Sequence, residues 1–258
     1  MAQACGRGDP VRYLRGMILA AGLGTRLRPL TERRPKALLE VGGRALIDYS
    51  VELLVGSGIT EIVVNLHYLG HMIREHLGDG SRYGARIYYS DEEPLLGSGG
   101  GIAHARGILG DGTFVTVNAD TIVDIDLREV IALHHQRAAT ATLVLRKDPR
   151  MEHFGLIYVD SQQRVRRFLD WGEPADRPGL EPFMYAGVQV LEPRVFRYMP
   201  CGKAFSMTSD TYPAMLLAGE PLFGHPFEGF WLTVGTPSEL AEAERVLARR
   251  PRRKRLGP

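Results

Sequence analysis

Short apolar runs alternate with amphipathic segments along the chain up to residue 146. The runs at 16–21, 61–66, 86–90, 113–120 and 140–146 are rich in β-branched and aromatic residues, which are typical of strands. Between the runs, apolar positions recur at helical spacing in residues 45–58, 70–78 and 127–139. This alternation predicts an α/β fold, with a Rossmann-like, mostly parallel sheet covered by helices on both faces.

The pattern changes after about residue 150. The segment "GLIYVDSQQRVRRFLD" predicts a hairpin that turns at residues 161–163, and "FMYAGVQVLEP" predicts a strand leading into a short helix. A last amphipathic helix is expected near "TPSELAEAERVLARR", with Thr236 as N-cap, Pro237 at the first helical position and Glu239 at the third. Without any linker or internal repeat, we expect one domain at 14–249, after an extension at 1–13 and before a basic tail at 250–258.

Composition narrows the class of protein. With 258 residues, of which 44% are hydrophobic and 24% charged, the chain is long enough to bury one substantial core. The two cysteines, Cys5 and Cys201, lie far apart and have no metal-ligand spacing, so we expect neither disulfides nor a zinc site. No apolar run approaches the roughly 18 residues that span a bilayer, and the N-terminus lacks the apolar middle of a secretory signal. We therefore expect a cytoplasmic protein without membrane insertion.

The charge is unevenly distributed. The net charge is +2, but residues 249–258 hold six Lys and Arg and no acid, which leaves the preceding part mildly acidic. A basic terminus of this kind can grip nucleic acid, but no interleaved aromatic residues accompany it. We therefore expect a solvated tail and no nucleic-acid partner.

Candidate chemistry begins in the loop after the first predicted strand, "LAAGLGTRLRPLTERRPKALL". Its glycines, Gly22 and Gly24, allow close approach of the backbone, and Thr25, Arg26 and Lys36 add a hydroxyl and two cations. The loop has neither the third glycine of a dinucleotide fingerprint nor the Gly-Lys-Ser/Thr of a Walker loop. Ligands of such sheets bind where the strands end at their carboxyl side. The loop therefore predicts a triphosphate site of a different kind.

These residues resemble a known family. The stretch "LAAGLGTRLRPLTERRPKALLEVGGRALI" is similar to the amino-terminal motif of the sugar-1-phosphate nucleotidyltransferases, G-x-G-T-R-x-x-P-L-T followed by P-K-P-L. The similarity continues through "LGSGGGI", "VNAD", "YAGVQVLEP" and "GFWLTVGTP". "HLGDGSRYG" and "EPLLGSGGGI" resemble most closely the short bacterial members, which include mannose-1-phosphate guanylyltransferases and N-acetylmuramate-1-phosphate uridylyltransferases.

The resemblance implies the nucleotide-diphospho-sugar transferase fold and a reaction of NTP with a sugar 1-phosphate that yields NDP-sugar and pyrophosphate. It implies a nucleotide-binding half at 14–146 and a sugar-binding half at 147–249. The implied catalytic residues are Arg26 for the departing pyrophosphate, Lys36 for the reacting phosphates and Asp120 for Mg²⁺. The other implied residues are, for the nucleotide, Ala20, Ala21, Gly22, Gly24, Thr25, Glu92, Gly97, Ser98, Gly99 and Asn118; for the sugar phosphate, Asp170, Trp171, Tyr185 and Gly187; and for the metal, Asp120 and Thr233.

The nucleobase is assigned through Glu92. Many family members read uracil or thymine with a glutamine at this position, whereas a carboxylate only accepts hydrogen bonds and suits the donors of guanine. GTP is therefore favoured. The alternative, that Glu92 lies in an acidic run facing water, has equal weight. Gly97 to Gly101 are expected to let the backbone approach a base or sugar closely.

Two positions depart from the family pattern. Where relatives have W-x-D-x-G-T-P with a metal-binding aspartate, this chain has Thr233, and where many have F-x-E-K-P it has Asp170 and Trp171. Either Asp120, water and substrate phosphates hold the metal, or another acid such as Asp210 substitutes, or activity is weakened.

Three functions remain open on the sequence. The first is a Mg²⁺-dependent guanylyltransferase acting on mannose 1-phosphate or a related sugar phosphate. The second is a uridylyltransferase using UTP and N-acetylmuramate or hexose 1-phosphate. The third is a catalytically weakened regulatory subunit that binds a nucleotide sugar. A homo-oligomer is also left open.

Overall fold

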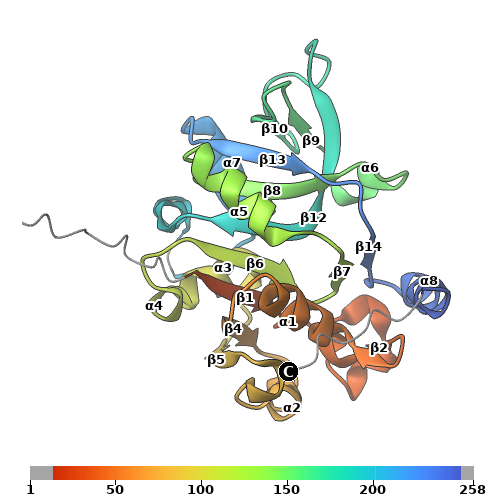
Figure 1. The fold of residues 1–258 in the computed structure, drawn as a ribbon. Helices are drawn as coiled ribbons and strands as arrows, with labels where there is room; N and C mark the ends of the chain where they lie inside the picture. Colours follow the sequence, from red (N-terminus) through yellow and green to blue (C-terminus); the bar gives the residue numbers. More distant parts are fainter. Residues whose placement is uncertain (1–13, 201, 251–258) are drawn as a thin grey trace, which may run out of the picture.

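The structure, a computed structural model, describes residues 14–200 and 202–250 (Figure 1). The predicted extension at 1–13, Cys5, Cys201 and the tail from residue 251 lie outside the described residues. A ten-stranded sheet forms the centre. Its strands are β1 (Arg15–Leu19), β4 (Glu61–Leu66), β5 (Arg86–Asp91), β6 (Phe114–Asn118), β8 (Ala141–Arg146), β9 (Ile157–Val159), β10 (Val165–Phe168), β11 (Trp171–Gly172), β12 (Glu181–Leu191) and β13 (Leu222–Pro226).

The strand directions decide where the site lies. The main path has the order β11-β10-β9-β12-β6-β1-β4-β5, and β8 pairs with both β12 and β13. β5, β4, β1 and β6 are parallel, whereas β12 is antiparallel to β6 and to β8. β8 and β13 therefore run in the same direction as the parallel set. The prediction of a mostly parallel sheet is confirmed, and the carboxyl ends of most central strands meet at one edge.

Helices cover both faces of the sheet, as predicted. Successive residues of β1 point to opposite faces, so Ile18 packs in the cluster of Leu54 and Val130, whereas Met17 packs with Ile102 and Met215. The first face carries α1 (Leu46–Gly56), α2 (Gly70–Leu77) and α5 (Leu127–Gln136). The second carries α3 (Gly97–His104), α4 (Arg106–Leu109) and α7 (Tyr212–Leu217).

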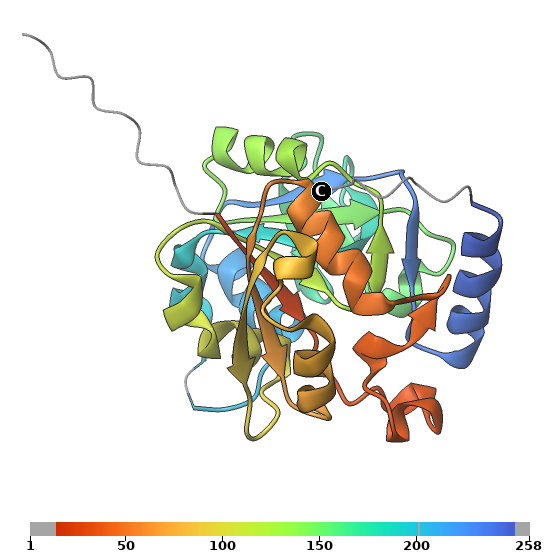
Figure 2. The same ribbon diagram turned by 60° about the horizontal axis from the view of Figure 1, so that its bottom comes forward.

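A smaller apolar cluster joins the two ends of the described chain. Leu27 and Leu39 from the first loops pack with Leu232, Val234 and Ala243. Leu232 belongs to β14 (Trp231–Thr233), which pairs with β7 (Thr121–Val123), Val234 follows β14, and Ala243 belongs to α8 (Pro237–Ala248). Figure 2 shows α8, in blue, beside the red and orange segment that follows β1. The amino-terminal loop is thus packed against the carboxyl-terminal helix.

The predicted local features of the second half are present. β9 and β10 form the expected hairpin, and β12 leads into a short helix, η5 (Pro193–Tyr198). The Thr236 hydroxyl accepts a hydrogen bond from the Glu239 amide, as expected of the N-cap. The remaining elements are β2 (Glu40–Val41), β3 (Arg44–Ala45), α6 (Met151–Phe154), η1 (Thr25–Leu27), η2 (Leu30–Glu32), η3 (Lys36–Leu38), η4 (Ser81–Tyr83) and η6 (Met207–Thr211). Within residues 14–200 and 202–250, no helix has the length and apolar character needed to cross a bilayer.

Candidate functional site

A cavity of about 370 Å³ opens at the carboxyl edge of β1 and β6. Its walls come from the loop after β1, the start of η3, the start of α3, the end of β6 and the segment before α8. The structure brings together here these predicted residues: Ala20, Ala21, Gly22, Gly24, Thr25, Arg26, Lys36, Gly97, Ser98, Asn118 and Asp120. Residues that the sequence reading missed complete the lining: Leu19, Ala37, Asn65, Leu95, Ala119 and Gly235.

The loop after β1 is held in shape by Gly24. Its φ of 63° lies in the left-handed region that favours glycine. A Cβ at Gly24 would lie 2.9 Å from Thr31 Cγ2 and 3.1 Å from Lys36 Cβ, so the loop backbone packs directly on the lysine stem. The Thr31 hydroxyl donates to the Gly24 carbonyl at 2.9 Å, and Leu27 is fully buried beneath the loop. The turn is therefore specified by local packing, and any larger residue at Gly24 displaces Lys36.

Lys36 and Asp120 meet across the floor of the cavity. Lys36 Nζ lies 2.5 Å from Asp120 Oδ2, and their side chains are 16% and 30% exposed. Asp120 follows β6 directly, and its other oxygen accepts a hydrogen bond from the Thr121 hydroxyl at 3.4 Å. A pair of this kind is a charge-assisted hydrogen bond, stronger than a neutral one. Lys36 and Asp120 therefore neutralise each other while both remain partly exposed in the cavity.

Arg26 contacts the carboxyl-terminal half of the chain through Gly235. A Cβ at Gly235 would lie 3.0 Å from both Arg26 Nη2 and Glu239 Oε2. The Gly235 amide donates to Glu239 Oε2 at 2.7 Å. The glutamate side chain thus reaches the residue before the N-cap, where a standard capping box would bond the amide of the N-cap itself. A side chain at position 235 would therefore have to shift the ends of the Arg26 and Glu239 side chains.

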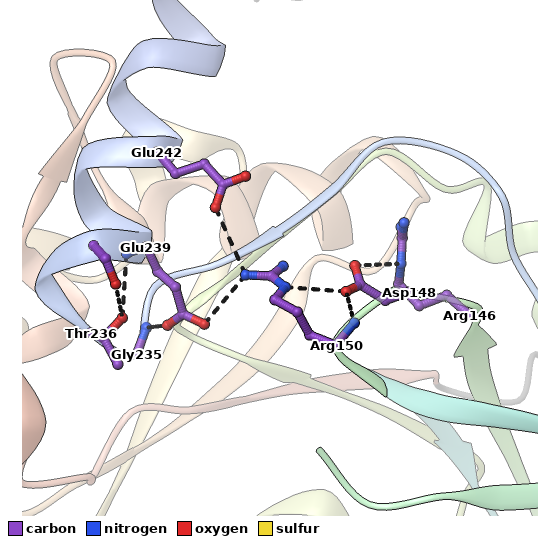
Figure 3. A network of polar contacts seen from close by, with 8 residues as sticks. Arg146, Asp148, Arg150, Gly235, Thr236, Glu239 and Glu242 are labelled. Atoms are coloured by element: carbon purple, nitrogen blue, oxygen red, sulfur yellow. Dashed lines mark hydrogen bonds and ion pairs between the residues drawn. The ribbon is translucent and has the colours of Figure 1, made fainter. Parts of the chain in front are cut away.

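Glu239 belongs to a wider polar network that joins α8 to the segment after β8 (Figure 3). Arg150 Nη1 lies 3.7 Å from Glu239 Oε1 and 3.8 Å from Glu242 Oε2, and Arg150 Nε donates to Asp148 Oδ1 at 3.1 Å. Burial opposes the charge on Asp148, but hydrogen bonds from Arg150 and the positive charges of Arg150 and Arg146 outweigh it and lower the pKa of Asp148. The network therefore connects the wall of the cavity to the second half of the chain.

The structure does not place Glu92 against a nucleobase or in water. Glu92 is only 3% exposed. One carboxylate oxygen accepts from the Asn65 amide group at 2.7 Å and the other from the Leu96 backbone at 2.9 Å. Asn65 in turn accepts a hydrogen bond from the Ala20 amide at 2.7 Å. The expectation that Glu92 faces water is wrong, and its carboxylate supports the cavity wall from behind because both oxygens are already engaged.

The glycines of α3 serve internal packing. A Cβ at Gly97 would lie 2.5 Å from the Phe205 carbonyl, and one at Gly99 would lie 2.3 Å from the Phe205 ring. Gly97 and Ser98 line the cavity, but Gly99 is buried against the Phe205 segment and does not. The Ser98 hydroxyl accepts from the Met207 amide at 3.1 Å. Close approach at Gly99 is therefore to the chain's own residues, in contrast to the expected contact with a base or sugar.

Tyr185 and Gly187 lie beside the Asp120 region without lining the cavity. Gly187 has a φ of 85°, and a Cβ there would lie 2.7 Å from the Thr121 hydroxyl and 3.4 Å from Asn118 Nδ2. The Tyr185 hydroxyl is buried without a hydrogen-bond partner among the described residues. Burial, with a smaller contribution from the negative charge of Asp120, raises the pKa of Tyr185. Tyr185 therefore remains a neutral phenol behind the cavity.

Asp170 and Trp171 are not brought to the cavity, contrary to their predicted place in the site. Asp170 lies in the turn between β10 and β11, and its side chain is fully exposed. Trp171 is the first residue of β11, which is an edge strand of the sheet. Trp171 is 49% exposed. In the sheet, β10, β9 and β12 lie between β11 and β6, the strand that ends at the cavity. Asp170 and Trp171 therefore do not contact the cavity, although they match a family motif that is assigned to the sugar phosphate.

Thr233 lies close to Asp120 through the backbone. Thr233 pairs with Thr121 across β14 and β7, and the Val234 amide donates to the Asp120 carbonyl at 3.0 Å. Asp210 does not line the cavity, and its Oδ2 accepts hydrogen bonds from the Ser206 amide and the Ser209 hydroxyl. Across the part of the chain that the structure describes, no three His, Cys, Asp or Glu side chains gather in an arrangement suited to a metal. Asp120 is therefore the acid available in the cavity.

Two of the missed residues carry a signal in the sequence. Asn65 interrupts the apolar run "EIVVNL" at the carboxyl end of a predicted strand, the position where ligand-facing polar residues are expected. Gly235 lies in the "GFWLTVGTP" segment, which matches the family motif, although only Thr233 in that segment was given a role at the site. The other four are apolar, and nothing in the local pattern separates them from core residues.

Comparison with known proteins identifies relatives of this chain. The profile of the family described as "Nucleotidyl transferase" matches residues 15–250. A mannose-1-phosphate guanylyltransferase of Mycobacterium tuberculosis is 32% identical over 90% of this chain and 64% of its own length. An N-acetylmuramate alpha-1-phosphate uridylyltransferase of Neisseria meningitidis is 36% identical over 90% of this chain and 97% of its own length.

The fold agrees with that of a solved structure. The crystal structure of a putative glucose-1-phosphate thymidylyltransferase from Bacillus anthracis superposes with a TM-score of 0.79 at 22% identity, covering 93% of this chain and 98% of that one. The chain spans 64% of the length of the mycobacterial relative and of a UTP–glucose-1-phosphate uridylyltransferase from Synechocystis. Sequence match, fold and the residues gathered at the cavity agree: the chain belongs to the nucleotidyl transferase family.

Proposed function

We propose that this protein transfers a nucleotidyl group from an NTP to a sugar 1-phosphate and releases pyrophosphate. The observation that carries the proposal is the convergence of Arg26, Lys36 and Asp120 on one cavity, with the lysine and the aspartate 2.5 Å apart. Two cations, a glycine loop and one carboxylate are what a polyanionic substrate needs, because phosphoryl chemistry depends mainly on positioning and charge neutralisation.

In this reaction an oxygen of the sugar phosphate attacks the α-phosphorus of the NTP. The bond from the α-phosphorus to the bridging oxygen breaks, and the pyrophosphate leaves with the electron pair. In this proposal Arg26 stabilises the charge on the leaving group, and Lys36 stabilises the charge on the reacting phosphates. Lys36 changes partner during the cycle, since the ammonium that pairs with Asp120 in the free protein is needed by the phosphates.

A magnesium ion is part of the proposal. Asp120 offers a partly exposed carboxylate in the cavity, and Mg²⁺ commonly binds one or two carboxylates together with waters and substrate phosphates. The donor set therefore fits Mg²⁺ with Asp120 as the protein ligand, and the Thr233 hydroxyl is a neutral neighbour at the position where relatives have an acid. When bound, the ion would neutralise charge on the phosphates.

The substrate pair is proposed in two forms. GTP with mannose 1-phosphate or a related sugar is supported by the guanylyltransferase relatives, although Glu92 gives it no support because its carboxylate is engaged inside the protein. UTP with N-acetylmuramate 1-phosphate is supported by the uridylyltransferase relatives, whose full length this chain nearly spans, at 96% and 97%.

A substrate panel tests the proposal. The protein with Mg²⁺ is given each common NTP together with mannose, glucose, N-acetylglucosamine or N-acetylmuramate 1-phosphate, and released pyrophosphate is measured. Turnover with one base and one sugar above the rest supports the proposal and selects the pair. Absence of turnover with every pair, together with tight binding of an NDP-sugar by calorimetry, identifies a regulatory binding subunit and refutes the enzymatic proposal.

A further inference from the structure

A second cavity, of about 320 Å³, lies away from the candidate site. It is lined by Pro193 and Phe196 and by three arginines, Arg106, Arg194 and Arg197. Arg106 begins α4, and the other residues lie in η5, which follows the last residue of β12. Leu191 of β12 pairs with Phe114, the first residue of β6. The second cavity therefore lies at the amino edge of the sheet, separated from the candidate site by the length of β6, roughly 15 Å.

An aromatic stack holds one of the three arginines in place. The Arg106 guanidinium carbon lies 5.1 Å from the centre of the Phe196 ring. Phe196 stacks on Phe114 with ring centres 5.7 Å apart and an interplanar angle of 17°. Phe114 is fully buried in the core, so the arginine rests on a ring that is itself anchored. A guanidinium held over an aromatic ring by a cation–π contact keeps its N–H donors available to a ligand.

The other two arginines differ in their partners. Arg194 Nη1 lies 3.4 Å from Glu220 Oε2. Glu220 is held by hydrogen bonds from the Tyr198 hydroxyl at 2.6 Å and the Thr140 hydroxyl at 2.5 Å. Within the described residues, the Arg197 guanidinium has no hydrogen bond or ion pair. The cavity therefore presents three guanidinium groups against one carboxylate, with a net positive charge.

We propose that this cavity binds the phosphate or diphosphate group of a small phosphorylated metabolite. Guanidinium groups match phosphate oxygens through paired N–H donors, and the shortage of acids leaves the site unneutralised until an anion arrives. The cationic side chains surround a hollow and do not form a stripe along the surface, whereas an extended nucleic acid needs a basic track. A small ligand is therefore favoured over a polyanion.

The second cavity is joined to the candidate site by one run of helix. α3 begins at Gly97, which lines the candidate site, and α4 begins two residues after α3 ends, at Arg106. α4 is attached to the amino edge of the sheet, where the Arg15 guanidinium donates to the Ile108 carbonyl at 2.6 Å. An anion bound at Arg106 would therefore contact the far end of the same helical segment that forms one wall of the candidate site.

Binding of inorganic pyrophosphate tests the proposal by calorimetry in a Lys36→Ala background, which weakens the candidate site. We expect saturable binding with a dissociation constant of about 0.1–1 mM, the range expected when a few charge-assisted contacts compete with the entropy of association. Adding Arg106→Gln and Arg197→Gln should weaken it by about tenfold or more. Arg86→Gln is the matched control, since Arg86 is an exposed arginine stacked 5.2 Å from the Tyr88 ring and outside the cavity.

Each outcome decides the proposal. Titrations with inorganic phosphate, a sugar 1-phosphate and a mononucleotide distinguish the sources of the phosphate group. Tighter binding of any of these ligands than of chloride at equal ionic strength supports the proposal. If the Lys36→Ala protein binds pyrophosphate equally well with and without Arg106→Gln and Arg197→Gln, the proposal is overturned. Tighter binding of an oligoribonucleotide than of pyrophosphate, lost with the same substitutions, overturns the assignment to a small ligand. All variants are checked for folding by circular dichroism, and none of the tested arginines lies in the candidate site.

Discussion

Lys36 Nζ and Asp120 Oδ2 lie 2.5 Å apart, although 84 positions separate the two residues in the chain. Lys36 starts η3 in the loops after β1, and Asp120 follows β6, so the contact joins the carboxyl ends of two paired parallel strands. Each residue supplies the charge that the other needs, and a hydrogen bond between charged groups contributes about 1.5–3 kcal/mol. Loss of either side chain therefore leaves an unpaired charge in the cavity.

Replacement of Asp120 by Asn is expected to lower kcat/KM by about 100-fold or more, since electrostatic groups at reacting phosphates commonly have effects of that size. The amide keeps the shape of the side chain but removes the charge that pairs with Lys36 and the proposed oxygen ligand for Mg²⁺. Pyrophosphate release with the best substrate pair measures the effect.

Asp91→Asn is the matched control for this substitution, because Asp91 is an exposed acid paired with Arg74 on the surface. We expect it to leave kcat/KM unchanged. Full activity of the Asp120→Asn protein at the same magnesium concentration would remove Asp120 from the proposed metal site.

Gly24→Ala and Gly43→Ala separate backbone strain from contact with the lysine. Both glycines have positive φ, 63° and 72°, so each substitution should cost about 1 kcal/mol in the free energy of unfolding. Only at Gly24 does the added Cβ meet Lys36 and Thr31, whereas at Gly43 it meets nothing within 4 Å. We expect Gly43→Ala to keep its activity and Gly24→Ala to lose most of it.

Thermal unfolding and pyrophosphate release, measured on both alanine variants, provide the comparison. Equal activity of the two proteins would show that the close packing of Gly24 on Lys36 does not matter for function.

Glu239→Ala and Glu242→Ala test the network of Figure 3. Glu239 accepts a hydrogen bond from the Gly235 amide at 2.7 Å, so Glu239→Ala should lower the free energy of unfolding by about 1–2 kcal/mol. It should also raise KM for the nucleotide, because Arg26 packs on Gly235 and would be held less firmly. Glu242 Oε2 lies 3.8 Å from Arg150 Nη1, and the Glu242 side chain is 43% exposed. Because exposed ion pairs contribute little, Glu242→Ala should lower the free energy of unfolding by less than about 0.5 kcal/mol. Denaturant unfolding and KM are measured for both. A KM unchanged by Glu239→Ala would separate the network from the cavity.

Thr233→Asp restores the residue type that relatives have at this position. Thr233 pairs with Thr121, the neighbour of Asp120, so the new carboxylate would be introduced next to the proposed metal ligand. We expect the Mg²⁺ concentration for half-maximal activity to fall by about tenfold, as expected of one added charged ligand. Thr233→Asn is the control, because it adds similar volume without the charge. It should leave the Mg²⁺ concentration for half-maximal activity unchanged. An equal effect of Asp and Asn would rule out a charge mechanism.

Asp148 should stabilise the fold in a pH-dependent way. Its folded-state pKa is lowered because the hydrogen bonds and charges of Arg150 and Arg146 outweigh the effect of burial. The stabilisation is therefore fully present above the unfolded-state pKa, about 3.9, and is lost as the pH falls through the lower folded-state pKa. Asp148→Asn should cost about 2 kcal/mol near neutral pH, and the difference from the wild type should shrink below about pH 4. A difference that stays constant between pH 7 and pH 3 would contradict this.

The sequence carried enough information for the sheet and for the centre of the site. The strand pattern is local, and Gly24, Arg26 and Asp120 lie next to predicted strand ends, where parallel topology gathers side chains, whereas Lys36 comes from the motif. Their convergence therefore follows from the fold class together with the motif.

The errors arose where a role depends on a distant partner. Glu92 is interpreted from the sequence either as a guanine-binding carboxylate or as part of an acidic surface run, but both its oxygens are engaged by Asn65 and the Leu96 amide, which only the folded chain supplies. Gly99 reads as a ligand-facing glycine, but the ring that fills its space comes from Phe205. Asp170 and Trp171 do not line the cavity, and the pairing order of the strands, which no local pattern specifies, places β11 at the edge of the sheet.

The small cluster that joins Leu27 and Leu39 to Val234 and Ala243 also determines when the site can form. During synthesis the loop after β1 leaves the ribosome early, but the apolar surface that covers Leu27 belongs to the last strand and helix of the described chain. Gly235, against which Arg26 packs, arrives with them. The nascent protein can therefore pair its first strands long before it can hold Arg26 in place, and the finished cavity appears only after residues 232–243 have been made.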